Sequence, residues 1–172
     1  SDAKVGLQKI SEALGDWKAP DDWYKRAIKE KNEWDAYVEK QSGPTNQEEP
    51  SYAHAVGAVY RNSDTSDIVV TAAGGLVGEV VQVWKPKQLN TFETEWGFSC
   101  MGYEISGALG IKMAKPDQDV VVFVGDGSYL LNNTDIYSSV IYDQKLIIIV
   151  CDNGGHMVIN RLQLAKGGKE YI

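Results

Sequence analysis

The sequence has few cysteines, an excess of acidic over basic residues, and no long apolar run. Its two cysteines, Cys100 and Cys151, stand far apart in apolar surroundings, which favours free thiols in a reducing compartment over a disulfide. No apolar stretch reaches the roughly 18 residues that a membrane-spanning helix needs. The N-terminus also lacks the basic and apolar segments of a signal peptide. We therefore expect a soluble cytoplasmic protein with no membrane partner.

Basic residues are outnumbered by acidic ones. The chain has 17 Lys and Arg against 24 Asp and Glu, for a formal net charge of −7. Proteins that bind nucleic acid usually present a basic face, so we expect no nucleic-acid partner. The charge does not exclude a small anionic cofactor, because a metal ion and backbone N–H groups can hold a diphosphate.

By composition, the chain divides near residue 47. Residues 1–47 are polar, and their spaced apolar residues predict two helices, over 7–14 and 21–41, before a linker. No chemistry is visible in this part, which we interpret as the helical tail of a preceding domain. Residues 48–172 are interpreted as the N-terminal part of a second domain. Hydrophobic residues make up 43% of the chain, enough for a buried core.

Beyond the linker, apolar runs alternate with helical patterns. Three continuous apolar runs predict buried strands, and helical spacing predicts helices before and between them. This alternation is typical of a parallel sheet covered on both faces, so the predicted fold class is α/β. The predicted strands cover residues 68–72, 119–124 and 146–151, and the predicted helices cover Tyr52–Tyr60, 101–114 and Leu130–Tyr142.

Small and polar residues follow each predicted strand, in the segments 73–75, 125–128 and 152–155. Ligands of parallel α/β sheets bind beyond the carboxyl ends of the strands. Asp126 and Asn153 carry hard oxygen donors of the kind that Mg²⁺ takes. Each segment alone is also typical of a turn, so an ordinary strand–helix–strand unit stays open as the alternative.

The spacing of two of these segments resembles a cofactor motif. Gly125-Asp126-Gly127, separated by residues 128–151 from Asp152-Asn153, is similar to the thiamine diphosphate (ThDP) motif of the acetolactate synthase and pyruvate decarboxylase superfamily. That motif begins with Gly-Asp-Gly and closes with an Asn pair, whose first member is replaced here by Asp152. The resemblance implies ThDP and Mg²⁺ as cofactors. It also implies Asp126, Asn153 and the main-chain carbonyl of Gly155 as the metal ligands.

Two further segments are similar to parts of the same superfamily. Thr71–Gly75 resembles the loop that contacts the diphosphate, and Ser99–Tyr103 resembles the segment that meets the aminopyrimidine. In the second of these segments, the resemblance implies that Met101 lies under the cofactor and bends it into a V. The alternative is that Met101 is a core residue on a helix face. His156 would touch the ligand or lie in a surface loop. The cofactor-binding residues that the resemblance implies are Gly74, Gly75, Leu76, Ser99, Cys100, Met101, Gly125, Gly127, Ser128, His156 and Met157.

The segments Glu95–Ile105 and Ile159–Gln163 narrow the resemblance to the ThDP-dependent hydrolases of myo-inositol catabolism. Those enzymes open 3D-(3,5/4)-trihydroxycyclohexane-1,2-dione to give 5-deoxyglucuronate. Glu104-Ile105-Ser106 stands where the wider superfamily has Gly or Ala followed by Leu-Pro. The resemblance covers nearly the whole chain and implies a cyclic dione as substrate. The alternatives are an acetolactate-synthase-like carboligase and a non-catalytic binding or assembly module that keeps the fold.

No segment of the sequence resembles the pyrimidine-binding domain of these enzymes, which supplies a Glu that helps to activate the cofactor. We expect that domain elsewhere in the same protein or in a second subunit, which implies a homo-oligomer. We therefore assign no catalytic residue among these 172 residues, and we expect an incomplete sheet and a chain that is inactive alone. Glu104 is expected to be a solvated helix carboxylate, with contact to the hydroxyls of the substrate as the alternative.

Overall fold

The computed structural model describes residues 2–170. Contacts divide the chain into two compact units, Ser1–Tyr37 and Val38–Ile172. The predicted domain ranges, 1–47 and 48–172, stay a prediction, and their residues 1, 171 and 172 lie outside the described residues. Among the helices that residues 2–170 form, none combines the length and the apolar character that a membrane crossing requires.

Two helices account for most of the first unit, which confirms the helices predicted there. They are α1 (Ala3–Leu14) and α2 (Asp21–Ser42), whose last turn belongs to the second unit. The Asp2 carboxylate caps α1 by accepting a hydrogen bond from the backbone N–H of Val5 at 3.2 Å. Gly15 then ends the helix at a φ of 52°, a conformation that glycine adopts at little cost.

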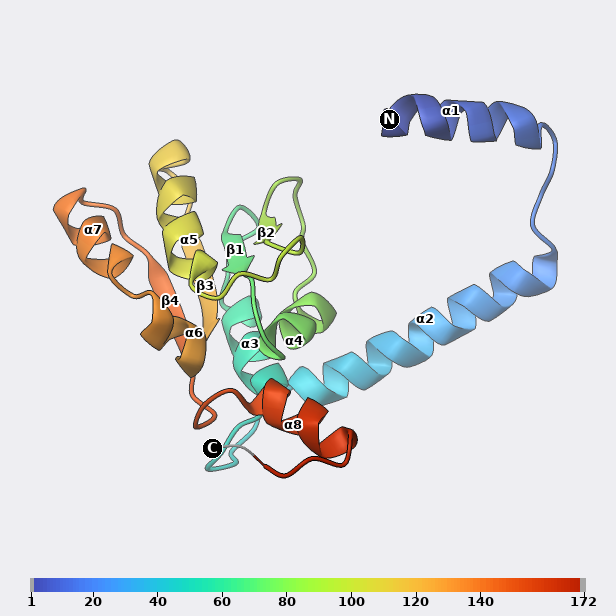
Figure 1. The fold of residues 1–172 in the computed structure, drawn as a ribbon. Coiled ribbons are helices and arrows are strands. Elements are labelled where there is room, and N and C mark those ends of the chain that lie inside the picture. Colours follow the sequence, from blue (N-terminus) through green and yellow to red (C-terminus); the bar gives the residue numbers. More distant parts are fainter. Residues whose placement is uncertain (1, 171–172) are drawn as a thin grey trace. The chain divides into compact units, whose positions relative to one another are not determined.

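The second unit is built on a four-stranded sheet in which every pairing is parallel, which confirms the predicted α/β fold (Figure 1). The order β2-β1-β3-β4 places the two most buried strands, β1 and β3, at the centre. In register, Val70 lies opposite Val122, and Val122 lies opposite Ile148. The strands are β1 (Ile68–Thr71), β2 (Phe92–Thr94), β3 (Val120–Gly125) and β4 (Ile147–Cys151).

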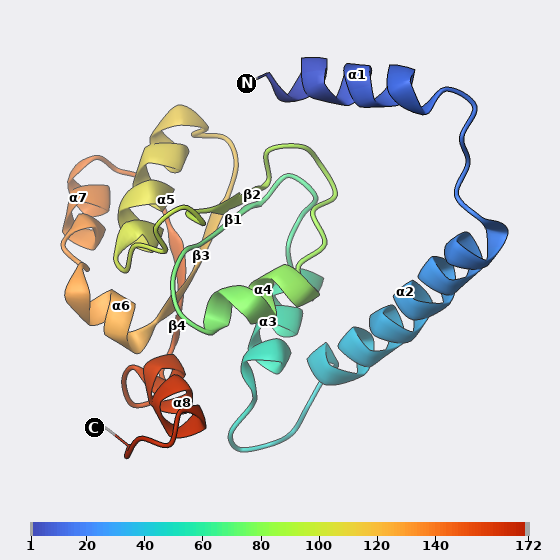
Figure 2. The same ribbon diagram turned by 45° about the vertical axis from the view of Figure 1, so that its right-hand side comes forward.

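Helices cover both faces of the sheet, because successive residues of a strand point to opposite faces. Phe123 points to the face that α3 (Tyr52–Arg61) and α4 (Leu76–Val83) cover. Val122 points to the other face, which α5 (Tyr103–Ala114) and α7 (Asp135–Ile141) cover. Figures 1 and 2 show these two helical layers with the sheet between them.

The prediction of a single helix over Leu130–Tyr142 is wrong. The structure has two short helices there, α6 (Asp126–Leu131) and then α7. Asn132 leaves the helical region, with φ −152° and ψ 83°, and its side-chain oxygen accepts a hydrogen bond from the Thr134 hydroxyl at 3.2 Å. Short polar side chains compete with helical hydrogen bonds in this way, and the chain therefore bends between α6 and α7.

Three elements have no counterpart in the sequence prediction: β2, α4 and α8 (Met157–Ala165). Two of them matter for the site, since α4 follows β1 and α8 follows β4. Together with α6 after β3, they make three strand-to-helix connections at one edge of the sheet. Parallel strands bring their carboxyl ends to the same edge, so these three connections lie close together.

Candidate functional site

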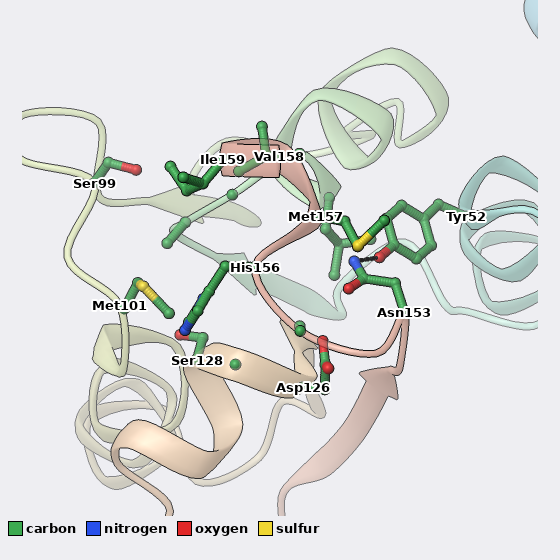
Figure 3. A pocket seen from close by; sticks show the side chains of 17 residues that line it. Tyr52, Ser99, Met101, Asp126, Ser128, Asn153, His156, Met157, Val158 and Ile159 are labelled. Atoms are coloured by element: carbon green, nitrogen blue, oxygen red, sulfur yellow. Dashed lines mark hydrogen bonds between the residues drawn. The ribbon is translucent and has the colours of Figure 1, made fainter. Parts of the chain in front are cut away.

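A cavity of about 380 Å³ lies where the chain leaves β1, β3 and β4 (Figure 3). Its lining includes every residue that the sequence predicted for the site except Cys100, which lies in the same loop as Met101. Residues that the sequence reasoning missed also line it, among them Tyr52, Val158 and Ile159. The lining residues are Tyr52, Ala73, Gly74, Gly75, Leu76, Ser99, Met101, Gly125, Asp126, Gly127, Ser128, Asn153, Gly155, His156, Met157, Val158 and Ile159.

Glycines leave the backbone of the cavity wall uncovered. A Cβ atom added at Gly74, Gly125 or Gly155 would meet no heavy atom within 4 Å among the described residues. Gly74 and Gly155 also adopt φ values of 77° and 131°, where a side chain would be strained. A ligand can therefore approach the main chain here more closely than it could approach a wall of larger residues.

Asp126 and Asn153 stand at the tips of neighbouring strands, β3 and β4. No described residue between 2 and 170 forms a hydrogen bond or an ion pair with the half-buried Asp126 carboxylate. The Asn153 side-chain nitrogen donates a hydrogen bond to the Tyr52 hydroxyl, which leaves its carbonyl oxygen as an acceptor. The Gly155 carbonyl accepts from the N–H of Met157 at 3.0 Å and keeps a second lone pair.

These three oxygens suit a hard cation such as Mg²⁺. Among the described residues there is no group of three His, Cys, Asp or Glu side chains that could hold a metal ion. The predicted ligand set does not depend on such a group, because it consists of one carboxylate, one amide and one main-chain carbonyl.

Tyr52, at the start of α3, lies beside Asn153 at the tip of β4 (Figure 3). Burial raises the pKa of its hydroxyl, and the nearby Cys151 and Asp126 side chains raise it further. The hydrogen bond from Asn153 lowers this pKa, but the net shift is upward. The hydroxyl is therefore neutral at physiological pH and serves as the acceptor that orients the Asn153 amide. The sequence offered only an aromatic residue at a helix start, which does not distinguish this position from a core residue.

The His156 side chain lines the cavity. Figure 3 shows its ring directed toward Ser128 and Met101. A Cβ atom at Gly127 would come within 2.7 Å of the His156 Cε1 atom. Glycine at position 127 therefore lets the imidazole lie against the first turn of α6.

The loop before α5 presents Ser99 and Met101 to the cavity. Glu95 shapes this loop, since its carboxylate accepts hydrogen bonds from the N–H groups of Cys100 and Phe98 at 2.9 and 2.8 Å. The Ser99 hydroxyl donates to the Ala72 carbonyl at 3.4 Å, at the end of β1. Met101 is 37% exposed and faces the cavity, so it is not a residue of the buried core.

The prediction that Glu104 is a solvated helix carboxylate is wrong. Its exposed fraction is 0%, and its carboxylate accepts hydrogen bonds from the N–H groups of Ala73 and Gly102 and from the Ser128 hydroxyl. Periodicity alone did not reveal this, because two of the three donors, Ala73 and Ser128, lie 31 and 24 positions away from Glu104 in the sequence.

Comparison with known proteins identifies the kind of domain. Residues 72–172, more than half of the chain, match the family described as "Thiamine pyrophosphate enzyme, C-terminal TPP binding domain". The chain belongs to this family. Thiamine pyrophosphate is ThDP, so the cavity at the edge of the sheet lies in a ThDP-binding domain.

Individual relatives extend the similarity over the part of the chain that precedes this ThDP-binding domain. The chain is 35% identical over 196 residues to "3D-(3,5/4)-trihydroxycyclohexane-1,2-dione hydrolase" of Geobacillus thermodenitrificans, covering 100% of the chain and 30% of the relative. A protein of the same name from Lacticaseibacillus casei is 40% identical over 142 residues, 83% of the chain and 22% of the relative. The Clostridium tetani protein of that name is 36% identical over 191 residues, 97% of the chain and 30% of the relative. The chain thus spans less than a third of the length of these relatives.

Proposed function

We propose that this ThDP-binding chain is the diphosphate- and Mg²⁺-binding part of a hydrolase that opens a trihydroxycyclohexane-1,2-dione ring to 5-deoxyglucuronate in myo-inositol catabolism. The observation that carries the proposal is the similarity of the whole chain to proteins named as that hydrolase. The cavity supports it, because the residues that resemble the cofactor motif line one space.

The wall of the cavity favours a metal-assisted diphosphate site. Among the described lining residues there is no Lys or Arg to balance a diphosphate. Asp126, Asn153 and the Gly155 carbonyl would hold Mg²⁺, whose charge offsets that of the diphosphate and whose remaining positions take phosphate oxygens. Gly74 and Gly75 would let the backbone after β1 lie against the diphosphate.

The rest of the cavity would receive the ring portion of the cofactor. When bound, ThDP supplies a carbanion nucleophile and an electron sink. Met101 would support the bent form of the cofactor, and Ser99 would line the same side. Val158 and Ile159 at the start of α8 would keep water from the cofactor with apolar side chains.

The complete protein needs a further domain. We infer that a pyrimidine-binding domain of the same protein or of a second subunit supplies the Glu that activates the cofactor. This arrangement favours a homo-oligomer. The composition described above favours the cytoplasm as its compartment.

An assay of the full-length protein with ThDP and Mg²⁺ tests the proposal. We expect it to consume the trihydroxycyclohexane-1,2-dione and to form a ring-opened carboxylate, without releasing CO₂ from pyruvate at a comparable rate. Acetolactate formation from pyruvate without dione consumption would show a carboligase instead. Binding of ThDP with turnover of neither substrate would show a non-catalytic module.

A further inference from the structure

Glu104 is a buried carboxylate held by three hydrogen-bond donors. Its Oε1 atom accepts from the N–H of Ala73 at 3.2 Å. Its Oε2 atom accepts from the N–H of Gly102 at 2.9 Å and from the Ser128 hydroxyl at 2.8 Å. An ionised carboxylate only accepts hydrogen bonds, so it matches a set of partners made up of donors alone.

The Ser128 hydroxyl both accepts and donates a hydrogen bond, which determines which group is the donor in each contact. Its oxygen accepts a hydrogen bond from the N–H of Gly102 at 2.7 Å, so its own hydrogen is free to point at Glu104. Ser128 is itself buried, at 4% exposed. The single hydrogen of the Gly102 N–H is therefore shared between the Ser128 oxygen and Glu104 Oε2, and these mutual contacts restrict the positions of all three groups.

Each donor belongs to a different segment of the cavity wall. Ala73 precedes the glycines that follow β1, Gly102 directly follows Met101, and Ser128 lies two residues after Asp126. The segments are far apart in sequence, since Glu104 is separated from Ala73 by 31 positions and from Ser128 by 24. Glu104 is thus a shared acceptor for the three parts of the wall that would meet the diphosphate, the ring and the metal.

We infer that Glu104 is a positioning residue, which holds these three segments at the spacing that the cofactor requires. The inference rests on the proposed ThDP site, and it assigns no contact between Glu104 and substrate. Loss of the Glu104 carboxylate would be costly because the site is buried. A backbone N–H that loses its acceptor inside the protein cannot form a replacement hydrogen bond with water.

The variant Glu104→Gln in the full-length protein tests the inference. An amide offers one oxygen and one NH₂ group, so its NH₂ must face either Ala73 or the pair of Gly102 and Ser128. We expect ThDP affinity, measured by calorimetry with Mg²⁺, to fall about tenfold or more, as is usual when a supporting partner of a ligand site is removed. In the cofactor-free protein, amide hydrogen exchange should accelerate in the peptides that contain Ala73 and Gly102, while β3 peptides exchange as in the wild type.

The variant Ile68→Val serves as a matched control for stability. Ile68 is 0% exposed and belongs to the same core cluster as Ile105, but it lies at the start of β1, away from the cavity. This variant should lower the melting temperature without changing ThDP affinity or exchange at Ala73 and Gly102. If it weakens ThDP binding as much as Glu104→Gln does, the effect is general destabilisation and the inference is wrong.

The remaining outcomes also decide the question. Wild-type affinity in Glu104→Gln overturns the positioning role, whether or not exchange changes. If that variant does not fold, Ser128→Ala tests the inference in its place. We expect faster amide exchange at Gly102 and weaker ThDP binding in Ser128→Ala. Wild-type exchange and wild-type affinity in this variant would contradict the inference. Absence of ThDP binding in the wild type would refute the proposed function, and exchange in the two variants would still show whether Glu104 holds the wall.

Discussion

Asp126 and Asn153 differ in how the protein uses their side chains. The Asn153 nitrogen is bonded to Tyr52, whereas the Asp126 carboxylate has no hydrogen-bond or ion-pair partner within residues 2–170. A half-buried carboxylate without a partner contributes little to stability and is available to a cation. Its removal should therefore affect binding far more than folding.

Asp126→Ala in the full-length protein should abolish Mg²⁺-dependent ThDP binding and leave the melting temperature almost unchanged. Calorimetric titration of ThDP with and without Mg²⁺ measures the first effect, and thermal unfolding measures the second. Asp117→Ala, in the exposed loop before β3, is the control and should bind ThDP as the wild type does. Unchanged affinity in Asp126→Ala would remove Asp126 from the metal site.

Glu95 gives the loop before α5 a dependence on pH. Its hydrogen bonds from the N–H groups of Cys100 and Phe98 lower the pKa of its carboxyl from the ordinary value of 4.5. Since the folded pKa lies below the unfolded one, the stabilisation is complete above pH 4.5 and is lost as the pH falls through the folded value. We expect an NMR titration of the Glu95 carboxyl carbon to show a midpoint below 4.5, with the two amides losing protection in the same range.

Glu95→Gln should remove this pH dependence and expose the same two amides to exchange at neutral pH. A wild-type midpoint at or above 4.5 would show that the hydrogen bonds do not form in solution.

Among the secondary-structure elements, the strands were easiest to predict and the helix breaks were hardest. The strands β1, β3 and β4 are continuous apolar runs, so burial alone indicates them. The strand β2 has three residues, one apolar, and it exists because it pairs with β1 in the folded state. The break between α6 and α7 depends on side-chain hydrogen bonds of Asn132, which compete with a helical pattern that the sequence shows on both sides.

The site was predictable to the extent that it follows the strand ends. Asp126, Asn153 and the glycines lie after predicted strands, and parallel pairing brings those positions together whatever the details of the helices. Tyr52 and Glu104 could not be found in this way, since each reaches the site through a tertiary contact from a helix.

The contact between α6 and the loop before α8 can be tested at Gly127. A methyl group in Gly127→Ala would lie 2.7 Å from the His156 ring, which must then move into the cavity or away from α6. We expect weaker ThDP binding with little loss of stability, because alanine favours a helix over glycine by about 1 kcal/mol.

Gly78→Ala is the matched control, since a Cβ atom at Gly78 in α4 meets nothing within 4 Å among the described residues. It should raise the melting temperature and keep ThDP affinity. The double variant of Gly127→Ala with His156→Ala should recover part of the binding if the clash with His156 is the cause. A double variant no better than Gly127→Ala would place the cause elsewhere.

At the scale of the whole molecule, the proposed function requires a second domain to complete the site. These 172 residues contain no segment that resembles a pyrimidine-binding domain with its Glu. We therefore expect the 172-residue chain alone to turn over neither the cyclic dione nor pyruvate, in an assay in which the full-length protein is active. Measurable turnover by the chain alone would show that the activating group lies within it.

The Glu104 network also bears on how the protein reaches its native state. Every strand pairing is parallel, so each requires a crossover connection, and the network then joins residues 31 and 24 positions apart. Contacts of this kind form only after the entropy of closing long loops has been overcome, and they are typical of slowly folding chains. We therefore expect the cavity to form late in folding, so that a partly folded chain would not yet offer a complete site for the cofactor. Because ThDP would bind only the finished structure, a higher ThDP concentration would raise the fraction of chains that remain folded.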